Sequence, residues 1–391
     1  MIASMITLVG GSPATAEPVF PTADPFYDYS GELADAGPGT ILRQRAISLR
    51  VDGVPVPAAA EQVLYRTTDE LGRPSATVAT IARPLAPAPT LRMVSYQMAY
   101  DALGPQCQPS YALQGGGSPT SLAALEANIV MAYLANGFTV VLPDYEGEGL
   151  AFAAGQESGY ATIDGIRAAL HSLAAPPTTP VGLVGYSGGS IATEFAAELA
   201  PSYAPELNIV GAAAGGPPVY LPHNLDYIDG SAKWASVIPF AFVGVSRGFD
   251  FDPAPYLSDY GATVLSEVAG TCFGDVEKPG LTVAQMLRPA NPSYRDIPPL
   301  MTILERLRMG ANGTPRGPLL LGVGNSDGIG DGVMVAADVR ALAADYCARG
   351  LTVQFREYSG LDHTGAIAPF AADALAYITA RLDNQPPPNT C

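Results

Sequence analysis

The sequence has few charged residues and even fewer basic ones. Charged residues make up 15% of the 391 positions, and 20 Lys and Arg stand against 37 Asp and Glu, which gives a formal net charge of −17. A chain this acidic has no general attraction for nucleic acid or for anionic membranes. No apolar run reaches the roughly 18 residues that a membrane-spanning helix needs. We therefore expect neither a nucleic-acid partner nor a transmembrane segment.

Cysteine is also scarce, and its spacing narrows the possible chemistry. The chain has four cysteines, and no two of them stand in the Cys-x-x-Cys spacing of zinc sites and thioredoxin-type centres: Cys107, Cys272, Cys347 and Cys391. Four cysteines permit three pairings. Cys391 follows a loose, proline-rich segment (383–390), where a disulfide would hold a free tail. Two disulfides in an exported protein are therefore favoured over four reduced thiols in a cytosolic enzyme.

The first residues also favour export. Met1 to Val9 are mostly apolar, and Ala14-Thr15-Ala16 has the small-x-small form of a signal cleavage site. The basic residues that usually precede such a stretch are missing. We interpret residues 1–16 as the remnant of a signal peptide, with a disordered leader as the alternative, and expect a secreted protein.

What the sequence does contain is enough apolar material for a large core. Apolar residues make up 48% of the chain, which excludes bulk disorder. The 42 glycines and 37 prolines follow no short period and indicate many turns around a compact fold. The length fits two or three domains, or one large α/β domain with an insertion.

The order of predicted elements indicates a mostly parallel sheet with helices on both faces. Short alternating runs predict an antiparallel meander. Continuous apolar strands then alternate with helices, as in a parallel sheet buried on both faces. The predicted meander strands are 46–49, 62–68 and 75–81; the later strands are 91–96, 138–144, 181–185, 207–214, 319–323 and 352–358; the helices are 121–136, 163–173 and 190–199. Residues 216–315 break this rhythm, and we interpret them as an insertion over the sheet.

One motif carries nucleophilic chemistry. Gly185-Tyr186-Ser187-Gly188-Gly189 has the form Gly-x-Ser-x-Gly, between a predicted strand and a predicted helix. Strand–turn–helix is the context that a nucleophile elbow requires. The turn would present Ser187 at the carboxyl edge of the sheet and aim the backbone N–H of Gly188 at a developing oxyanion. A glycine-rich turn with an incidental serine is the alternative.

A serine nucleophile needs a base, and the chain offers only three histidines. His171 lies within a predicted helix and is interpreted as a surface or packing residue. His223 lies at the start of the insertion and is interpreted as structural. His363 follows the last predicted strand, which completes the order Ser…Asp/Glu…His typical of α/β-hydrolases. His363 is therefore the predicted base.

The acid that orients this base must lie between Ser187 and His363. Asp327 comes soonest after the strand 319–323, and Asp331 comes just before the next helix. We favour Asp331 as the acid and keep Asp327 as the alternative. A calcium-like loop of Asn325, Asp327 and Asp331 is a further alternative, although it lacks the distal glutamate of an EF-hand.

With these residues assembled, the sequence resembles the secretory lipase family typified by Candida antarctica lipase A, here in a bacterial form. Further motifs that carry the resemblance are Asp24-Pro25-Phe26-Tyr27, Pro38-Gly39-Thr40, the stretch from Ser95-Tyr96 to Tyr100-Asp101 with Cys107, Pro143-Asp144-Tyr145-Glu146-Gly147, Ile163-Asp164-Gly165-Ile166-Arg167 and 203–211. The resemblance covers most of the chain. The segment Gly328-Ile329-Gly330-Asp331 resembles a local insertion relative to the family, so both acids stay open, and the lid is the least similar part of the chain.

The resemblance implies an α/β-hydrolase core (17–215 and 316–391) with a helical lid (216–315). It implies disulfides Cys107–Cys272 and Cys347–Cys391. It also implies that Asp101, with the backbone of Gly188, forms the oxyanion hole, which requires a buried, protonated aspartate.

The implied activity is hydrolysis of acyl esters such as triacylglycerols through an acyl-enzyme, with no cofactor or metal. The expected partners are a lipid or other acyl ester and, transiently, a lipid interface. An acyltransferase or peptidase on the same fold is the alternative, because chemistry follows the pocket rather than the fold. A non-catalytic binding module is the third.

Overall fold

A computed structural model describes residues 18–51, 53–117 and 122–391. The predicted signal-peptide remnant at 1–16 lies outside the described residues. Within the described part of the chain, no helix is long and apolar enough to cross a membrane.

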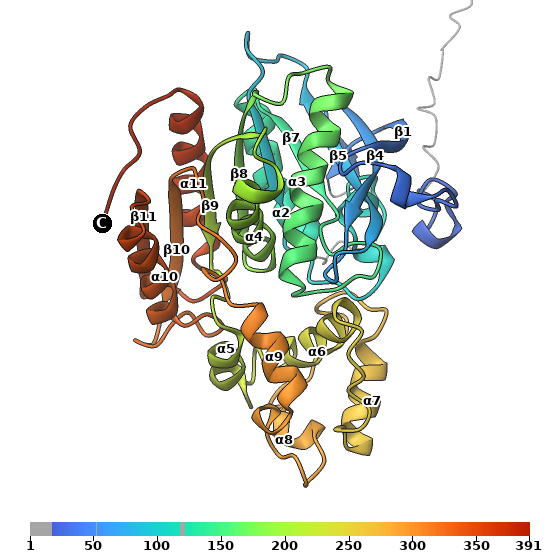
Figure 1. The fold of residues 1–391 in the computed structure, drawn as a ribbon, viewed down its shortest axis with the longest axis vertical. Helices are drawn as coiled ribbons and strands as arrows, with labels where there is room; N and C mark the ends of the chain where they lie inside the picture. Colours follow the sequence, from blue (N-terminus) through green and yellow to red (C-terminus); the bar gives the residue numbers. More distant parts are fainter. Residues whose placement is uncertain (1–17, 52, 118–121) are drawn as a thin grey trace, which may run out of the picture.

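The described residues form one sheet of nine strands in the order β1-β4-β5-β7-β6-β8-β9-β10-β11, with a separate small hairpin β2-β3 (Figure 1). The strands are β1 Ile41–Ile47, β2 Arg50–Val51, β3 Val54–Pro55, β4 Ala58–Thr68, β5 Pro74–Pro84, β6 Met93–Gln97, β7 Thr139–Pro143, β8 Pro180–Tyr186, β9 Asn208–Gly215, β10 Leu319–Asn325 and β11 Val353–Ser359. β1, β4 and β5 pair antiparallel, as does β5 with β7. From β7 to β11 all pairings are parallel.

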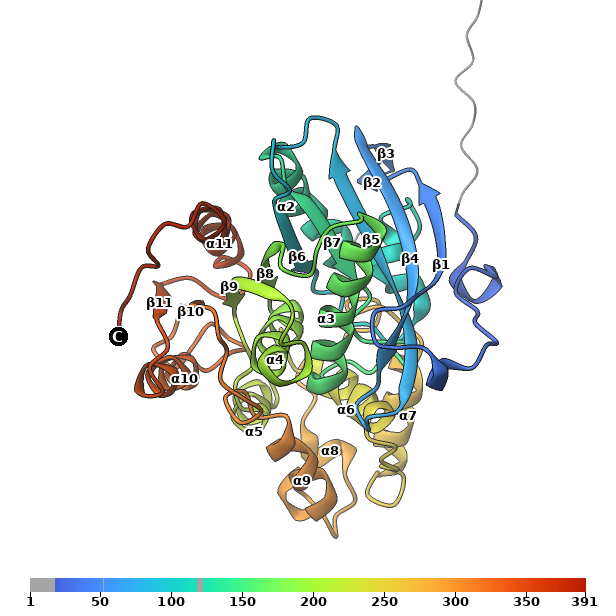
Figure 2. The ribbon, with the colours of Figure 1, turned by 45° about the horizontal axis from the view of Figure 1, so that its top comes forward.

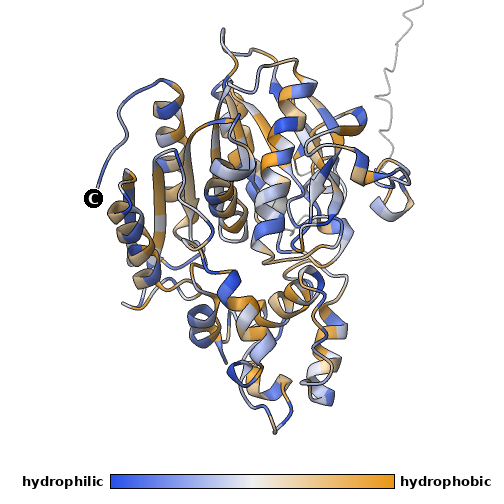
Figure 3. Ribbon diagram, viewed as in Figure 1, coloured by the Kyte–Doolittle hydropathy of each residue, from blue (hydrophilic) through white to orange (hydrophobic). Residues whose placement is uncertain are grey.

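Helices cover both faces of this sheet, because its strands are apolar on both sides (Figure 2). In β10, Leu319, Leu321 and Val323 pack into one core cluster, and Leu320 packs into the other. One face is covered by α3 Gly155–Ser172, α4 Gly188–Tyr203 and α10 Ala336–Ala348, and the other by α2 Leu122–Ala135 and α11 Ile367–Leu382. The central strands, such as β8 and β10, are largely hydrophobic, whereas the outer helices carry hydrophilic sides (Figure 3). The predicted α/β-hydrolase fold is confirmed.

Two elements begin clearly earlier than their predicted starts, β1 and α3. The first meander strand is β1 at Ile41–Ile47, so the predicted strand at 46–49 is wrong beyond Ile47. Helix α3 begins at Gly155, eight residues before the predicted start. The glycines in its first turns hide it from propensity-based prediction, since glycine destabilises an isolated helix by about 1 kcal/mol relative to alanine.

These glycines let α3 lie close against α4, the helix that follows Ser187. A Cβ atom on Gly159 would lie 2.9 Å from the backbone carbonyl carbon of Phe195 and 2.9 Å from Leu199 Cδ1. Backbone atoms cannot move aside as a flexible side chain can. Glycine is therefore required here for packing rather than for backbone freedom.

The insertion lies between β9 and β10 and packs below the sheet in Figure 1. It contains α5 Leu221–Ile228, α6 Val237–Gly248, α7 Asp259–Val268, α8 Val283–Met286 and α9 Pro298–Arg306. Its apolar residues continue the core cluster that contains α3 and α4, including Phe240, Val264 and Leu300. The insertion therefore shares a continuous hydrophobic core with the rest of the protein and is not joined to it by the chain alone.

Two disulfides join the pairs that the family resemblance implies. Cys107–Cys272 connects the loop after β6 to the insertion, and Cys347–Cys391 connects α10 to the C-terminal residue. The C-terminal segment lies beside the edge strand β11, where Thr390 N donates to Val353 O at 2.8 Å. This pairing covers part of an otherwise exposed sheet edge.

We predict that Gly159→Ala destabilises the protein by about 1–2 kcal/mol, because crowding at the backbone of α4 outweighs the gain in helix propensity. Thermal or denaturant unfolding measures the difference. Gly149→Ala is the matched control, since a Cβ there meets nothing within 4 Å. A Gly159→Ala variant as stable as this control would contradict the close packing of α3 on α4.

Candidate active site

Ser187 lies at the turn between β8 and α4 in a strained backbone conformation. Its φ is 53° and its ψ is −124°, which a serine adopts only when the surroundings enforce it. Its N–H donates to Gly215 O of β9 at 2.8 Å. A Cβ on Gly185 would lie 2.2 Å from the carbonyl oxygen of Gly189, so the turn closes only with small residues on both sides. This is the geometry of a nucleophile elbow.

His363 follows β11 and contacts the serine directly. His363 Nε2 lies 2.8 Å from Ser187 Oγ. The ring is buried and packs against two aromatic residues, with centroids 5.1 Å from Tyr186 and 5.4 Å from Trp234. Tyr186 Oη also donates to the carbonyl oxygen of His363 at 2.7 Å. Packing and hydrogen bonding together fix the orientation of the imidazole.

Of the two candidate acids, Asp331 is the one in contact with the histidine. Asp331 Oδ2 lies 2.8 Å from His363 Nδ1, and Asp331 is fully buried. Its other oxygen accepts the backbone N–H groups of Val333 at 3.0 Å and Met334 at 2.7 Å. The backbone holds the two residues together as well, because His363 N donates to Asp331 O at 2.8 Å. The backbone N–H groups of Val333 and Met334 thus orient the Asp331 carboxylate toward the imidazole.

Asp327 lies on the exposed side of the same loop and does not reach His363. It accepts the N–H groups of Ile329 and Gly330 and the hydroxyl of Tyr227 at 2.7–2.9 Å. The backbone N–H of Gly330 is the largest of the influences that lower the pKa of Asp327. This residue stabilises the turn that carries Asp331.

The residues of the calcium-like alternative have separate partners. Asn325 binds Gly328 N and Glu357, while Asp327 and Asp331 bind the groups described above. Among the described residues, no group of three His, Cys, Asp or Glu side chains could hold a metal ion.

Asp101 and Gly188 lie side by side next to the serine. Asp101 has a φ of 44°, and a Cβ on Gly188 would lie 1.8 Å from Asp101 Oδ1, so the carboxyl occupies the space that a side chain at 188 would fill. Asp101 Oδ1 is buried and accepts no hydrogen bond from described residues. Burial raises the pKa of Asp101 to about 7, against the lowering effect of His363. The group can therefore carry a proton and act as a donor.

The other two histidines lie away from this centre. His171 is exposed near the end of α3. His223 Nδ1 lies 2.9 Å from Asp338 Oδ2, which links α5 of the insertion to α10 of the core. The structural interpretation of His223 agrees with this contact.

A cavity of about 240 Å³ opens beside Ser187, lined by the core and the insertion. Its polar lining residues are Asp101, Glu126, Ser187, Asn224, His363 and Thr364, and no Lys or Arg of the described chain lines it. The remaining lining is apolar and includes Phe152, Ile191, Leu225 and Val237. Such a cavity suits an uncharged, apolar group next to a nucleophile.

Three residues at the site escape sequence reasoning. Trp234, from the insertion, lies edge-on against the ring of His363. Glu126, which also lines the cavity, and Glu146 are buried and accept the backbone N–H groups of Ala99 and Ala102. Only Glu146 had a signal, as part of the Pro-Asp-Tyr-Glu-Gly motif, and that motif does not reveal its role.

The model of the Secretory lipase family matches residues 114–390. Lipase A of Arthroderma benhamiae is 35% identical, over 94% of this chain and 80% of that protein. A probable inactive lipase of Mycobacterium tuberculosis is 33% identical, over 94% of this chain and 84% of that protein. Among solved structures, the closed state of Candida antarctica lipase A superimposes with a TM-score of 0.86 at 28% identity, covering 96% of this chain and 89% of that chain.

We predict that Asp331→Asn slows the labelling of Ser187 by a fluorophosphonate probe about 10³–10⁴-fold, because an amide no longer holds the reactive tautomer of His363. Asp327→Asn is the matched control and should label within about threefold of the unmodified protein, since an Asn side chain can keep the turn. Equal slowing in both variants, or slowing in Asp327→Asn alone, would contradict the choice of Asp331.

Proposed function

The chain belongs to the secretory lipase family, and from that premise we propose that it is a secreted serine ester hydrolase acting on neutral acyl esters. The observation that carries the proposal is the unbroken hydrogen-bonded chain from Ser187 through His363 to Asp331 beside an apolar cavity. Membership of a secretory family and two disulfides support an extracellular location.

The geometry supports a two-step acyl transfer. Ser187 Oγ attacks the ester carbonyl while His363 Nε2 takes its proton, and Asp331 stabilises the resulting imidazolium. The N–H of Gly188 at the start of α4 and the protonated carboxyl of Asp101 face the developing oxyanion. His363 then protonates the leaving alcohol. Water, activated by the same histidine, attacks the acyl-enzyme and releases the acid.

The cavity supports uncharged acyl groups of modest length. It offers no cation to a carboxylate or phosphate, and the net charge of −17 repels anions at long range. At about 240 Å³ the cavity is smaller than the roughly 300–1,000 Å³ of most small-molecule sites, which favours short and medium acyl chains over long ones. We propose short- and medium-chain esters, including triacylglycerols of that chain length, at neutral or zwitterionic lipid surfaces.

The competing proposal is that this protein binds lipid without hydrolysing it. It is suggested by the name of the Mycobacterium tuberculosis relative, a probable inactive lipase. A non-catalytic chain has no need to retain the nucleophile, base and acid in mutual contact. In this chain all three are present, with both contacts at 2.8 Å. These distances favour an active enzyme. Transfer to alcohols or amines would use the same acyl-enzyme and is distinguished by product analysis.

We predict that the protein hydrolyses p-nitrophenyl esters, with the highest kcat/KM at or below octanoate and a marked decrease at palmitate. Ser187→Ala should lower kcat by about 10⁶ while leaving the melting temperature unchanged. Spectrophotometric assays across acetate, butyrate, octanoate and palmitate measure both. No hydrolysis of any ester by folded, disulfide-bonded protein would refute the proposal, and a rate that rises steadily to palmitate would refute the chain-length limit.

We predict that kcat falls as the pH rises through about 7, because Asp101 then loses the proton it donates to the oxyanion. Asp101→Asn keeps an N–H donor at every pH, so this alkaline decline should disappear. Asp101→Ala removes the donor and should lower kcat about 10²–10³-fold below pH 7, where the native Asp101 is protonated. If the decline persists unchanged in Asp101→Asn, its origin lies in another group.

A further inference from the structure

Two buried glutamates from other parts of the chain hold the turn that carries Asp101. Ala99 N donates to Glu126 Oε2 at 3.0 Å, and Glu126 lies on α2. Ala102 N donates to Glu146 Oε2 at 3.1 Å, and Glu146 follows β7. The two anchored amides therefore lie on either side of Asp101 in the sequence.

Each glutamate is fixed in turn by tyrosines of the same region. Tyr96 Oη donates to Glu126 Oε2 at 3.2 Å. The backbone N–H of Glu146 donates to Tyr100 Oη at 2.6 Å, and the ring of Tyr100 packs on Tyr145 with centroids 4.9 Å apart. All of these side chains are buried. The anchors are therefore rigid.

The burial of two carboxyl groups at this turn carries a cost in the free energy of folding. Burying a carboxyl group without a compensating cation is unfavourable, and among the described residues neither Glu126 nor Glu146 forms an ion pair. What the two groups hold is the φ of 44° at Asp101, a conformation that a non-glycine residue leaves when nothing enforces it. Relaxation of this turn would withdraw the carboxyl from Gly188.

We propose that Glu126 and Glu146 are positioning residues of the oxyanion hole, which together hold the left-handed turn at Asp101 so that its carboxyl stays against Gly188 and beside Ser187. This inference rests on the proposed function. Because the oxyanion develops only after the substrate has bound, a displaced Asp101 lowers kcat and leaves KM nearly unchanged.

The proposal is tested by replacing the carboxylate acceptors of Glu126 and Glu146 and measuring kcat and KM with p-nitrophenyl butyrate. Glu126→Leu and Glu146→Leu should each lower kcat about 10–100-fold, with KM within about threefold. Glu126→Gln and Glu146→Gln keep an oxygen acceptor for the same backbone N–H and should recover most of the lost kcat. Where a leucine variant fails to fold, methionine at that position fills the space without a strong acceptor and carries the same expectation.

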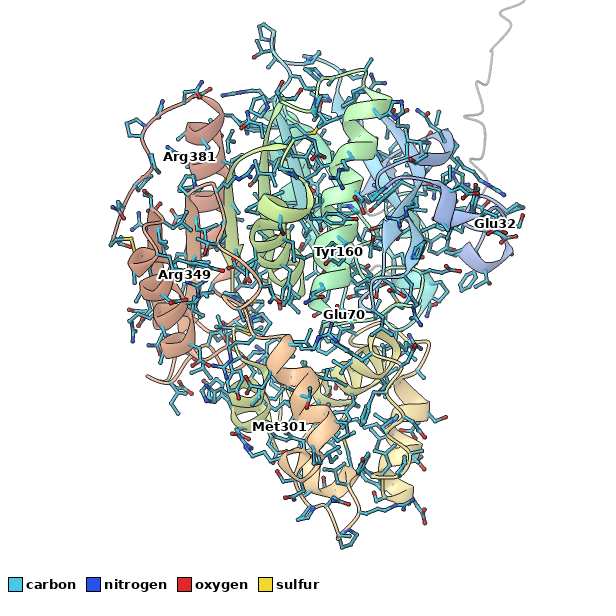
Figure 4. The ribbon with its side chains drawn as sticks, viewed as in Figure 1. Glu32, Glu70, Tyr160, Met301, Arg349 and Arg381 are labelled. Carbon is cyan, nitrogen blue, oxygen red and sulfur yellow. A yellow bond between two sulfur atoms is a disulfide. The ribbon has the colours of Figure 1, made fainter. Side chains whose placement is uncertain are left out.

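Glu70→Leu is the matched control for loss of a buried glutamate. Glu70 is 1% exposed and accepts the backbone N–H of Glu157 at 3.0 Å, as the two proposed anchors accept backbone N–H groups. It differs from them in having Arg306 3.9 Å away, and it does not line the cavity beside Ser187. It lies where the core meets the insertion (Figure 4). Its replacement should lower the melting temperature without the selective decrease in kcat.

Combining each glutamate variant with Asp101→Ala distinguishes a role in positioning Asp101 from a general loss of stability. In an Asp101→Ala background, Glu126→Leu and Glu146→Leu should each lower kcat by less than about threefold, because the group they position is gone. If the glutamate variants lowered kcat in that background by the same factor as in the otherwise unmodified protein, the inference would be overturned. It would also be overturned if, in an active protein, they lowered the melting temperature without a selective decrease in kcat, as expected for Glu70→Leu. A protein with no esterase activity would instead overturn the proposed function, and this inference with it.

Discussion

The chemistry proposed for this protein depends on the backbone of Ser187, whose φ of 53° turns the side chain away from the sheet and toward His363. This conformation is unfavourable in isolation and persists because the neighbouring strands and helix over-determine it. The N–H of Ser187 is held by β9, and the next turn of backbone begins α4. The contacts within the parallel sheet thus stabilise the strained backbone conformation that exposes the side chain of Ser187. The close packing of α3 on α4 extends the same constraint into the core.

Around this turn the protein buries carboxyl groups rather than cations. Asp101, Glu126 and Glu146 are all buried, and burial raises the pKa of each. Glu126 and Glu146 accept backbone N–H groups, which favour an ionised carboxylate, whereas Asp101 Oδ1 accepts none. Burial raises the pKa of Asp101 to about 7 and that of Glu126 to about 8, so negative charge is unfavourable at each of these carboxyls and Asp101 keeps its proton up to about pH 7. An acid that stays protonated beside a serine can stabilise an oxyanion, which a carboxylate in the same place would destabilise.

The reactive residues could be predicted from sequence because each follows the end of a strand, where chain order and sheet direction bring side chains together. Ser187, His363 and the pair of candidate acids were found in this way. The choice between Asp327 and Asp331 depended on which side of one loop each residue faces, which spacing does not encode. Glu126 and Glu146 were out of reach for a different reason. Their roles come from backbone amides in distant elements, and such contacts leave no pattern of residue types.

The insertion contributes to the site by more than covering it. Trp234 packs against His363, the hydroxyl of Tyr227 binds Asp327 in the loop of Asp331, and Arg247 donates to Leu103 O at 3.0 Å just after the Asp101 turn. The insertion therefore touches the base, the acid loop and the oxyanion turn at three separate points. A movement that widened the cavity by breaking all three contacts would also loosen the groups that perform the chemistry. Access for substrate is compatible with catalysis only if the segments carrying these contacts stay in place while other parts of the insertion move.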